Sequence, residues 1–208
     1  MNPVLPNGLT DCLLWSDELG YGWHPRQPMS YEGDYFAKYQ ALDATPMGAA
    51  LTAARVELVA KYANPWAVVD IGIGGGRFVT ESCCCGYDVS EEARAWLESR
   101  DSYIDPYCYP QSIDHATCWD SLEHIPNPEE FMATVKSWIF VSMPTYESAV
   151  ECLASKHYKP GEHLHYFSIN GFCQWADKQG FEVVEINHME TELGREGITT
   201  FVLRRYRG

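Results

Sequence analysis

Hydrophobic residues recur along the chain first with helical spacing and then in short, uninterrupted runs. In residues 47–62 they lie near one stripe of an alanine-rich segment, which predicts an amphipathic helix that Asn64-Pro65 ends. Apolar runs typical of buried strands follow at 67–71, 84–87, 116–119 and 138–142, and two more strands are expected at 181–186 and 198–204.

Polar residues between the apolar runs indicate where helices begin. Ser90 and Asn127-Pro128 each precede two glutamates, so each offers a cap followed by negative charge in the first helical turn. Ser168 or Asn170 is expected to open a later helix. Strands that alternate with helices and end in a strand pair predict an α/β fold with a mostly parallel, doubly wound sheet. Right-handed crossovers would bring the carboxyl ends of its strands to one face, where we expect the functional site.

The beginning of the chain has a different character. The first thirty residues are rich in Pro, Gly and aromatic residues and have no sustained period, so they predict an irregular arm. Tyr31, Tyr35 and Tyr39 recur every fourth residue and would share one face of a helix, whose role is either packing or a lid over a site. We therefore expect an aromatic arm with a lid-like helix in residues 1–46 and one main domain in residues 47–208.

Charge and cysteine usage narrow the classes of function. With 15 basic and 29 acidic residues the net charge is −14, which argues against tight, non-specific nucleic-acid binding but does not exclude a local basic patch. The sequence has no run long enough to span a membrane and no signal-peptide pattern at its start, so a cytoplasmic protein without a membrane partner is expected. Its eight cysteines, three of them consecutive at 83–85, lack C-x-x-C pairs and predict reduced thiols, and no metal site is expected.

A glycine-rich stretch carries the most specific chemistry. Residues 68–78 read VVDIGIGGGRF, so a predicted strand is followed by a loop whose backbone N–H groups can lie against a ligand. The G-x-G-x-x-G pattern of nicotinamide enzymes fails, because Arg77 stands where the third glycine should be. Asp70, at the strand end, suits a ligand that carries an ammonium group. Asp88, at the end of the next strand, can accept both hydroxyls of a ribose.

A ligand with a ribose, an adenine and an amino acid in place of phosphates is S-adenosylmethionine, and at this point the sequence resembles the class I methyltransferases. Residues 70–76 are similar to their first motif and Asp88 to the acid of their second. Residues 113–128, with the pair Glu123-His124, and residues 162–167 resemble the ubiquinone-type subgroup (methyltransferase types 11 and 12). The resemblance covers residues 47–205. It implies a Rossmann-like sheet of seven strands with an antiparallel last strand, and S-adenosylmethionine as the cofactor.

The resemblance also implies roles for individual residues. The stretch between the second and fourth strands is shorter than the resemblance implies, and Asp105 within residues 103–107 is the candidate for the acid near the adenine. The cofactor-binding residues expected in this way are Asp70, Gly72, Ile73, Gly74, Gly76, Asp88, Val89, Asp105, Trp119 and Asp120.

Methyl transfer needs alignment above all, and a base only where the acceptor must lose a proton. His124 is the candidate base, since an imidazole titrates near neutrality; the alternative is a helix-start histidine bonded to backbone. Candidates for contact with the acceptor are Tyr31, Tyr35, His163, His165, Glu190 and Arg195.

The expected function is therefore that of a methyltransferase that uses S-adenosylmethionine and acts on an oxygen or nitrogen atom of a small molecule. Two alternatives remain open at this point: a methyltransferase that acts on a macromolecule, either nucleic acid or protein, and a non-catalytic nucleotide-binding module.

Overall fold

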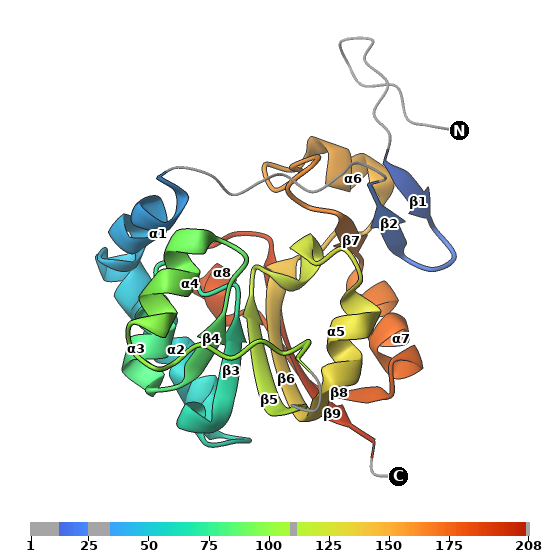
Figure 1. The fold of residues 1–208 in the computed structure, drawn as a ribbon. Coiled ribbons are helices and arrows are strands. Elements are labelled where there is room, and N and C mark those ends of the chain that lie inside the picture. The colour runs from blue at the N-terminus through green and yellow to red at the C-terminus, as the bar shows by residue number, and fades with distance from the viewer. Residues whose placement is uncertain (1–12, 25–33, 109–111, 207–208) are drawn as a thin grey trace.

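A six-stranded sheet forms the centre of the computed structural model, which describes residues 13–24, 34–108 and 112–206. Its strand order is β4-β3-β5-β6-β9-β8 (Figure 1). The strands are β3 Val68–Ile71, β4 Cys85–Tyr87, β5 Ile113–Trp119, β6 Val135–Pro144, β8 Phe181–Asn187 and β9 Ile198–Arg205. Strands β3, β4, β5 and β6 pair in parallel, whereas β9 runs antiparallel to both of its neighbours, β6 and β8. The mostly parallel, Rossmann-like α/β fold with an antiparallel last strand is thus confirmed.

The expected seventh strand of this sheet is reduced, in the described residues, to one isolated bridge. Tyr103 pairs in parallel with Gly86 of β4, at the edge where a further strand would extend the sheet. Directly afterwards the chain turns, because the Asp105 carboxylate accepts the N–H of Tyr107 at 2.9 Å and Pro106 has no N–H to donate. A longer strand cannot continue through this turn.

Helices cover both faces of the sheet. On one face lie α2 Pro46–Ala60, α3 Arg77–Ser82 and α4 Glu91–Glu98, and on the other α5 Pro128–Thr134 and α7 Ile169–Lys178 (Figure 1). The remaining elements are the helices α1 Tyr35–Asp43, α6 Ala149–Ala154 and α8 Met189–Glu192 and the short 3-10 turns η1 Pro65–Ala67 and η2 Leu122–His124. No helix in the described ranges is long and apolar enough to cross a membrane.

Helix starts follow the local sequence in most cases. Ser90 and Ser168 cap α4 and α7, and their hydroxyls accept the N–H groups of Ala93 and Gly171. Asn127 precedes α5 as expected, but its side chain makes no cap bond within the described structure, so that its predicted capping role is wrong. Its backbone, with φ −123° and ψ 74°, lies outside the extended conformation that the capping residues of α4 and α7 adopt.

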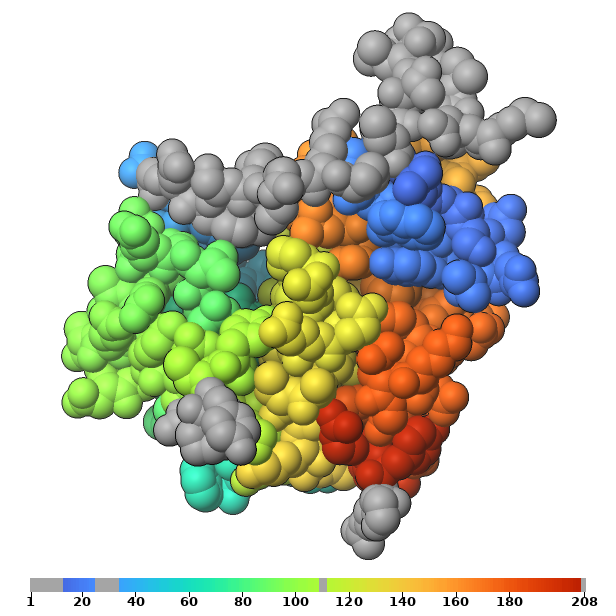
Figure 2. All heavy atoms as spheres, turned by 45° about the vertical axis from the view of Figure 1, so that its right-hand side comes forward, coloured from blue at the N-terminus to red at the C-terminus, as the bar shows by residue number. Residues whose placement is uncertain are grey.

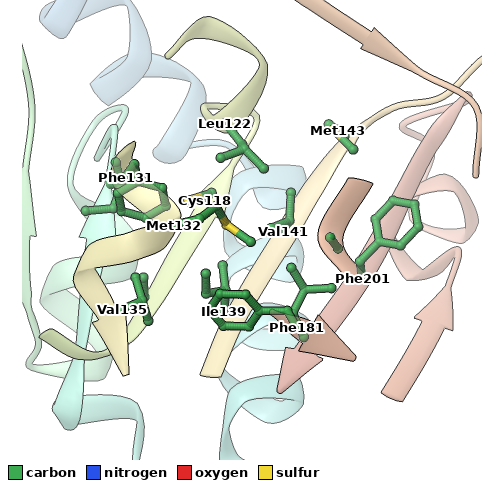
Figure 3. Packing of buried hydrophobic residues seen from close by; sticks show 14 of the residues in the cluster. Cys118, Leu122, Phe131, Met132, Val135, Ile139, Val141, Met143, Phe181 and Phe201 are labelled. Carbon is green, nitrogen blue, oxygen red and sulfur yellow. The ribbon is translucent and has the colours of Figure 1, made fainter. Parts of the chain in front are cut away.

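The core is divided between the two faces by the alternation of side chains along the strands. Ile139 and Val141 of β6 pack against α5 and α7, while Phe140 between them packs against the α2 side. Figure 3 shows the first of these layers, whose side chains come from α5 and from β5, β6, β8 and β9. On β3 the same alternation places Asp70 on the face of Val68, toward α2.

The region expected to be an irregular arm contains regular structure. Strands β1 Leu14–Ser16 and β2 Tyr21–Trp23 form a hairpin, and β2 pairs antiparallel with β7 His165–Phe167. In the space-filling view the hairpin, in blue, lies against the orange residues that include β7 (Figure 2). The expectation was wrong because three-residue strands show no readable period and their partner lies far along the chain.

Candidate functional site

A cleft of about 1080 Å³ opens at the carboxyl ends of β3, β4 and β5 and is bordered by α1 and α2. Parallel strands end at one edge of a sheet, so each delivers its last side chains and following loop to this place. The expected site residues that line the cleft are Tyr35, Asp70, Gly72, Ile73, Gly74, Asp88, Val89, Trp119, Asp120, His124, His163 and Arg195. Gly76, Asp105, His165 and Glu190 do not line it, and Tyr31 lies outside the described residues.

Glycines allow the loop after β3 to form one wall of the cleft. Gly72 and Gly74 both have positive φ, 74° and 56°, and a Cβ on Gly72 would lie 2.7 Å from the Cβ of Ser121. Gly76 also has positive φ, but a Cβ there would lie 2.6 Å from the ring of Trp96. Gly72 and Gly74 therefore shape the cleft. Gly76 allows close packing against α4, and its contact with a cofactor stays a prediction.

Asp88 is held rigidly at the end of β4. Its Oδ2 accepts the N–H of Ile73 at 3.0 Å and its Oδ1 accepts the N–H of Ser90 at 2.8 Å. Burial raises the pKa of this carboxyl, and the two backbone N–H groups act against that rise. Each oxygen retains a lone pair that can accept a hydroxyl in the cleft.

Asp70 lies at the bottom of the cleft and is only 1% exposed. The Thr117 hydroxyl donates to its Oδ1 at 2.7 Å. Burial raises the pKa of Asp70 to about 7, with the charges of Asp88 and Asp43 adding to the rise and Arg55 opposing it. A cation placed beside this carboxyl would favour its ionised form.

Two arginines and two acids form an ion-pair network beside Asp70. Arg55 of α2 donates to Glu190 at 2.8 Å and lies 3.4 Å from Asp120, while Arg195 donates to both Asp120 and Glu190. Glu190 is completely buried and bonded to both arginines, which corrects the expectation that it contacts the acceptor. Arg195 lines the cleft, but its guanidinium is engaged by the two acids. The network joins α2, the end of β5 and α8.

His124 and His163 face each other across one end of the cleft, with ring centroids 4.7 Å apart in an edge-to-face arrangement. Burial lowers the pKa of His124 to about 4. Burial and the neighbouring His124 and Lys159 lower the pKa of His163 to about 2. The expectation that His124 titrates near neutrality is therefore corrected. Its imidazole is neutral at pH 7 and can accept a proton, but as a weak base.

His165 has a structural position instead. Its Nδ1 bonds the Tyr21 hydroxyl at 2.7 Å and its Nε2 bonds the carbonyl of Ile125 at 2.9 Å. Because both ring nitrogens are bonded in this way and His165 does not line the cleft, the expected contact with an acceptor is corrected. The Asp105 carboxylate likewise bonds its own turn and does not line the cleft, and its role near an adenine stays a prediction.

The α1 helix borders the cleft through Tyr35 and Tyr39, whose rings lie 4.7 Å apart. Sequence reasoning missed Asp43 at the end of this helix. Asp43 accepts the N–H of Arg77 at 3.2 Å, and its carbonyl accepts a bond from the Arg77 side chain at 2.6 Å, so it ties α1 to the glycine loop. Sequence reasoning also missed Arg55, whose only signal was its place on the hydrophobic stripe of the helix predicted at 47–62. A lid role for the helix stays a prediction.

Comparison with known families gave one match over most of the chain. A family model described as a methyltransferase domain matches residues 42–186, a range that holds the glycine loop, Asp88 and the end of β5. A sequence comparison with curated proteins found no match.

Solved structures share this fold at low identity. A methyltransferase in complex with the Trm112 activator of Haloferax volcanii has 16% identity and a TM-score of 0.62, over 84% of this chain and 97% of that one. Magnesium protoporphyrin IX methyltransferase of Synechocystis PCC 6803, with bound SAH, has 13% identity and a TM-score of 0.56, over 86% and 90%. A SAM-dependent methyltransferase of Thermotoga maritima has 17% identity and a TM-score of 0.57, over 83% and 97%.

Proposed function

The chain belongs to the class I S-adenosylmethionine-dependent methyltransferases, and we propose that it transfers the methyl group to an oxygen or nitrogen atom of a small molecule. The observation that carries the proposal is the convergence of Asp70, the loop from Gly72 to Gly74, and Asp88 on one cleft. When bound, the cofactor supplies a methyl group on a sulfonium, which needs no further activation.

The residues of the cleft fit this cofactor. Asp88, fixed by two backbone N–H groups, would accept the ribose hydroxyls, and Asp70 would lie beside the ammonium group. At Gly74 the nearest atom to an added Cβ is on Tyr39, 3.6 Å away, so the bare backbone leaves room for a ligand to approach. Trp119 and Asp120 would border the methionine portion.

The acceptor would lie at the other end of the cleft, near His124 and His163. The volume of about 1080 Å³ suits a cofactor together with a small acceptor. Because the pKa of His124 is lowered to about 4, the chain's own contribution is alignment and exclusion of water more than strong base catalysis. A net charge of −14 further favours a small molecule over a nucleic acid.

Calorimetry with S-adenosylmethionine tests the cofactor site. Asp88→Ala should weaken binding by about tenfold to a hundredfold, because two hydroxyl bonds to a carboxylate are lost. Asp114→Ala is the matched control, since Asp114 is an exposed acid on β5 that does not line the cleft. Equal affinities for the wild type and the Asp88 variant would show that the ribose assignment is wrong.

Transfer of a labelled methyl group tests the reaction itself. Pools of phenols, carboxylic acids and amines should accept the label, and protein or nucleic-acid pools should not. Labelling of a macromolecule alone would overturn the small-molecule proposal, and tight binding without transfer to any pool would favour a nucleotide-binding module.

A further inference from the structure

Three side chains with metal-binding atoms meet at the end of the cleft. Glu123 and His124 lie in η2, directly after β5, and His163 lies two residues before β7. One ligand atom from each lies within 4.8 Å of the others. The N–H of Leu164 donates to the carbonyl of Glu123 at 2.9 Å, so the two segments are bound to each other beside the cluster.

Two members of this cluster, Glu123 and His163, have buried atoms without hydrogen-bond partners in residues 13–24, 34–108 and 112–206. Glu123 is 1% exposed, and neither of its carboxyl oxygens has such a partner among the described residues. His163 is 5% exposed, and its Nδ1 is also without a hydrogen-bond partner in the same part of the chain. Buried polar groups are nearly always paired, and an unpaired one costs about 1–3 kcal/mol. Unpaired oxygens on a buried carboxyl therefore indicate that the carboxyl of Glu123 binds a ligand.

We propose that Glu123, His124 and His163 bind one divalent metal ion of the borderline type represented by Zn²⁺. Two imidazoles and one carboxylate are a known ligand set for zinc, which leaves at least one coordination position for another molecule. The ligand atoms of a tetrahedral zinc site lie about 3.4 Å apart, so the three side chains need to draw together by roughly an ångström. The Nε2 of His124 already lies 3.8 Å from Oε1 of Glu123.

The charges around the cluster are nearly balanced. The positive charge of Lys159 would repel a cation, but its ammonium lies 3.0 Å from the carboxylate of Glu162, which also lines the cleft. Asp120 adds negative charge and is itself paired with Arg195. A bound cation would therefore face no unpaired positive charge from these residues.

The open coordination position would face the cleft, because His124 and His163 both line it. The metal would then hold an acceptor that offers an oxygen atom, such as a hydroxyl or a carboxylate, and orient it for methyl transfer. This role rests on the proposed function, whereas metal binding itself does not.

Metal analysis and Zn²⁺ calorimetry on the full chain, after treatment with a chelator, test the site. The wild type should bind one equivalent of Zn²⁺. Glu123→Gln and His163→Ala should each bind it about tenfold more weakly or worse. Glu123→Gln keeps the size and shape of the side chain, and its melting temperature is measured without and with metal beside that of the wild type. Zn²⁺ should raise that temperature in the wild type but not in the variant.

His188→Ala is the matched control, because His188 is an exposed histidine that does not line the cleft and its loss should leave Zn²⁺ binding unchanged. A wild type that binds no Zn²⁺, or variants that bind it as tightly as the wild type, would overturn the proposal. Calorimetry with S-adenosylmethionine on the same samples separates the two proposals. Cofactor binding without Zn²⁺ binding refutes the metal site alone, and Zn²⁺ binding without cofactor binding refutes the proposed function alone.

Discussion

Replacement of Asp70 by asparagine should make the protein more stable at high pH while it weakens cofactor binding. The carboxyl is buried, and its pKa is raised from 3.8 to about 7. Between these two values the folded chain holds a proton that the unfolded chain has lost, so the stability of the wild type falls as the pH rises through this window. Asparagine has no such proton, and it can still accept the bond from Thr117.

The size of the effect follows from the two pKa values. A difference of about three corresponds to roughly 4 kcal/mol when the carboxyl is fully ionised in the folded state. Part of this cost is already present at pH 5, so between pH 5 and pH 8 the wild type should lose about 2.5 kcal/mol relative to Asp70→Asn.

Urea unfolding of both proteins at pH 5, 6, 7 and 8 measures this difference. Asp114→Asn, at an exposed acid, is the control and should differ in stability from the wild type by about 0.5 kcal/mol or less. A difference between Asp70→Asn and the wild type that stays constant over the range would refute the reasoning, because it would mean that Asp70 is already ionised at pH 5.

The same carboxyl should give cofactor binding a pH dependence. An ammonium group beside Asp70 stabilises the ionised form, so the affinity of the wild type for S-adenosylmethionine should fall as the pH drops below about 7. Asp70→Asn should bind the cofactor about tenfold more weakly at pH 8 and lack this dependence. This pair of results would show that stability is sacrificed at this position for binding.

Two further predictions concern the packing around the cleft. Arg55→Met should lower the free energy of unfolding by about 3 kcal/mol in urea titrations, because the buried Glu190 would keep only Arg195 of its two arginine partners. A loss below about 1 kcal/mol would contradict this account. Gly75→Ala should lower the free energy of unfolding by about 1–3 kcal/mol and reduce cofactor affinity, because the new Cβ would lie 2.5 Å from Oδ2 of Asp43 and 2.6 Å from the backbone N of Gln40. An unchanged melting temperature and an unchanged affinity in calorimetry would show that α1 does not pack on the loop in this way.

Much of the main sheet could be predicted because its signals are local. The helix expected at 47–62 is α2 Pro46–Ala60, and the last two strands expected at 181–186 and 198–204 are β8 and β9. The β1-β2 hairpin could not be predicted, since β2 pairs with β7 about 140 residues away and each strand has only three residues.

The residues of the candidate site likewise divide into those that the sequence could predict and those that it could not. Parallel strands end at one edge of a sheet, and this rule alone is enough to bring Asp70, Asp88 and Asp120 together; all three line the cleft. The rule could not show that Glu190 is buried between two arginines, or that Asp43 holds the glycine loop, because those partners come from other elements.

The sequence by itself therefore determined the fold class and the carboxylates at the strand ends, since periodicity and strand order are properties of the chain. Only the tertiary structure decided their protonation and their partners. Burial and charges on distant segments raise the pKa of Asp70 and lower those of His124 and His163. Burial also leaves the carboxyl of Glu123 without a hydrogen-bond partner in the described part of the chain. Those quantities depend on distances in space, which spacing along the chain does not contain.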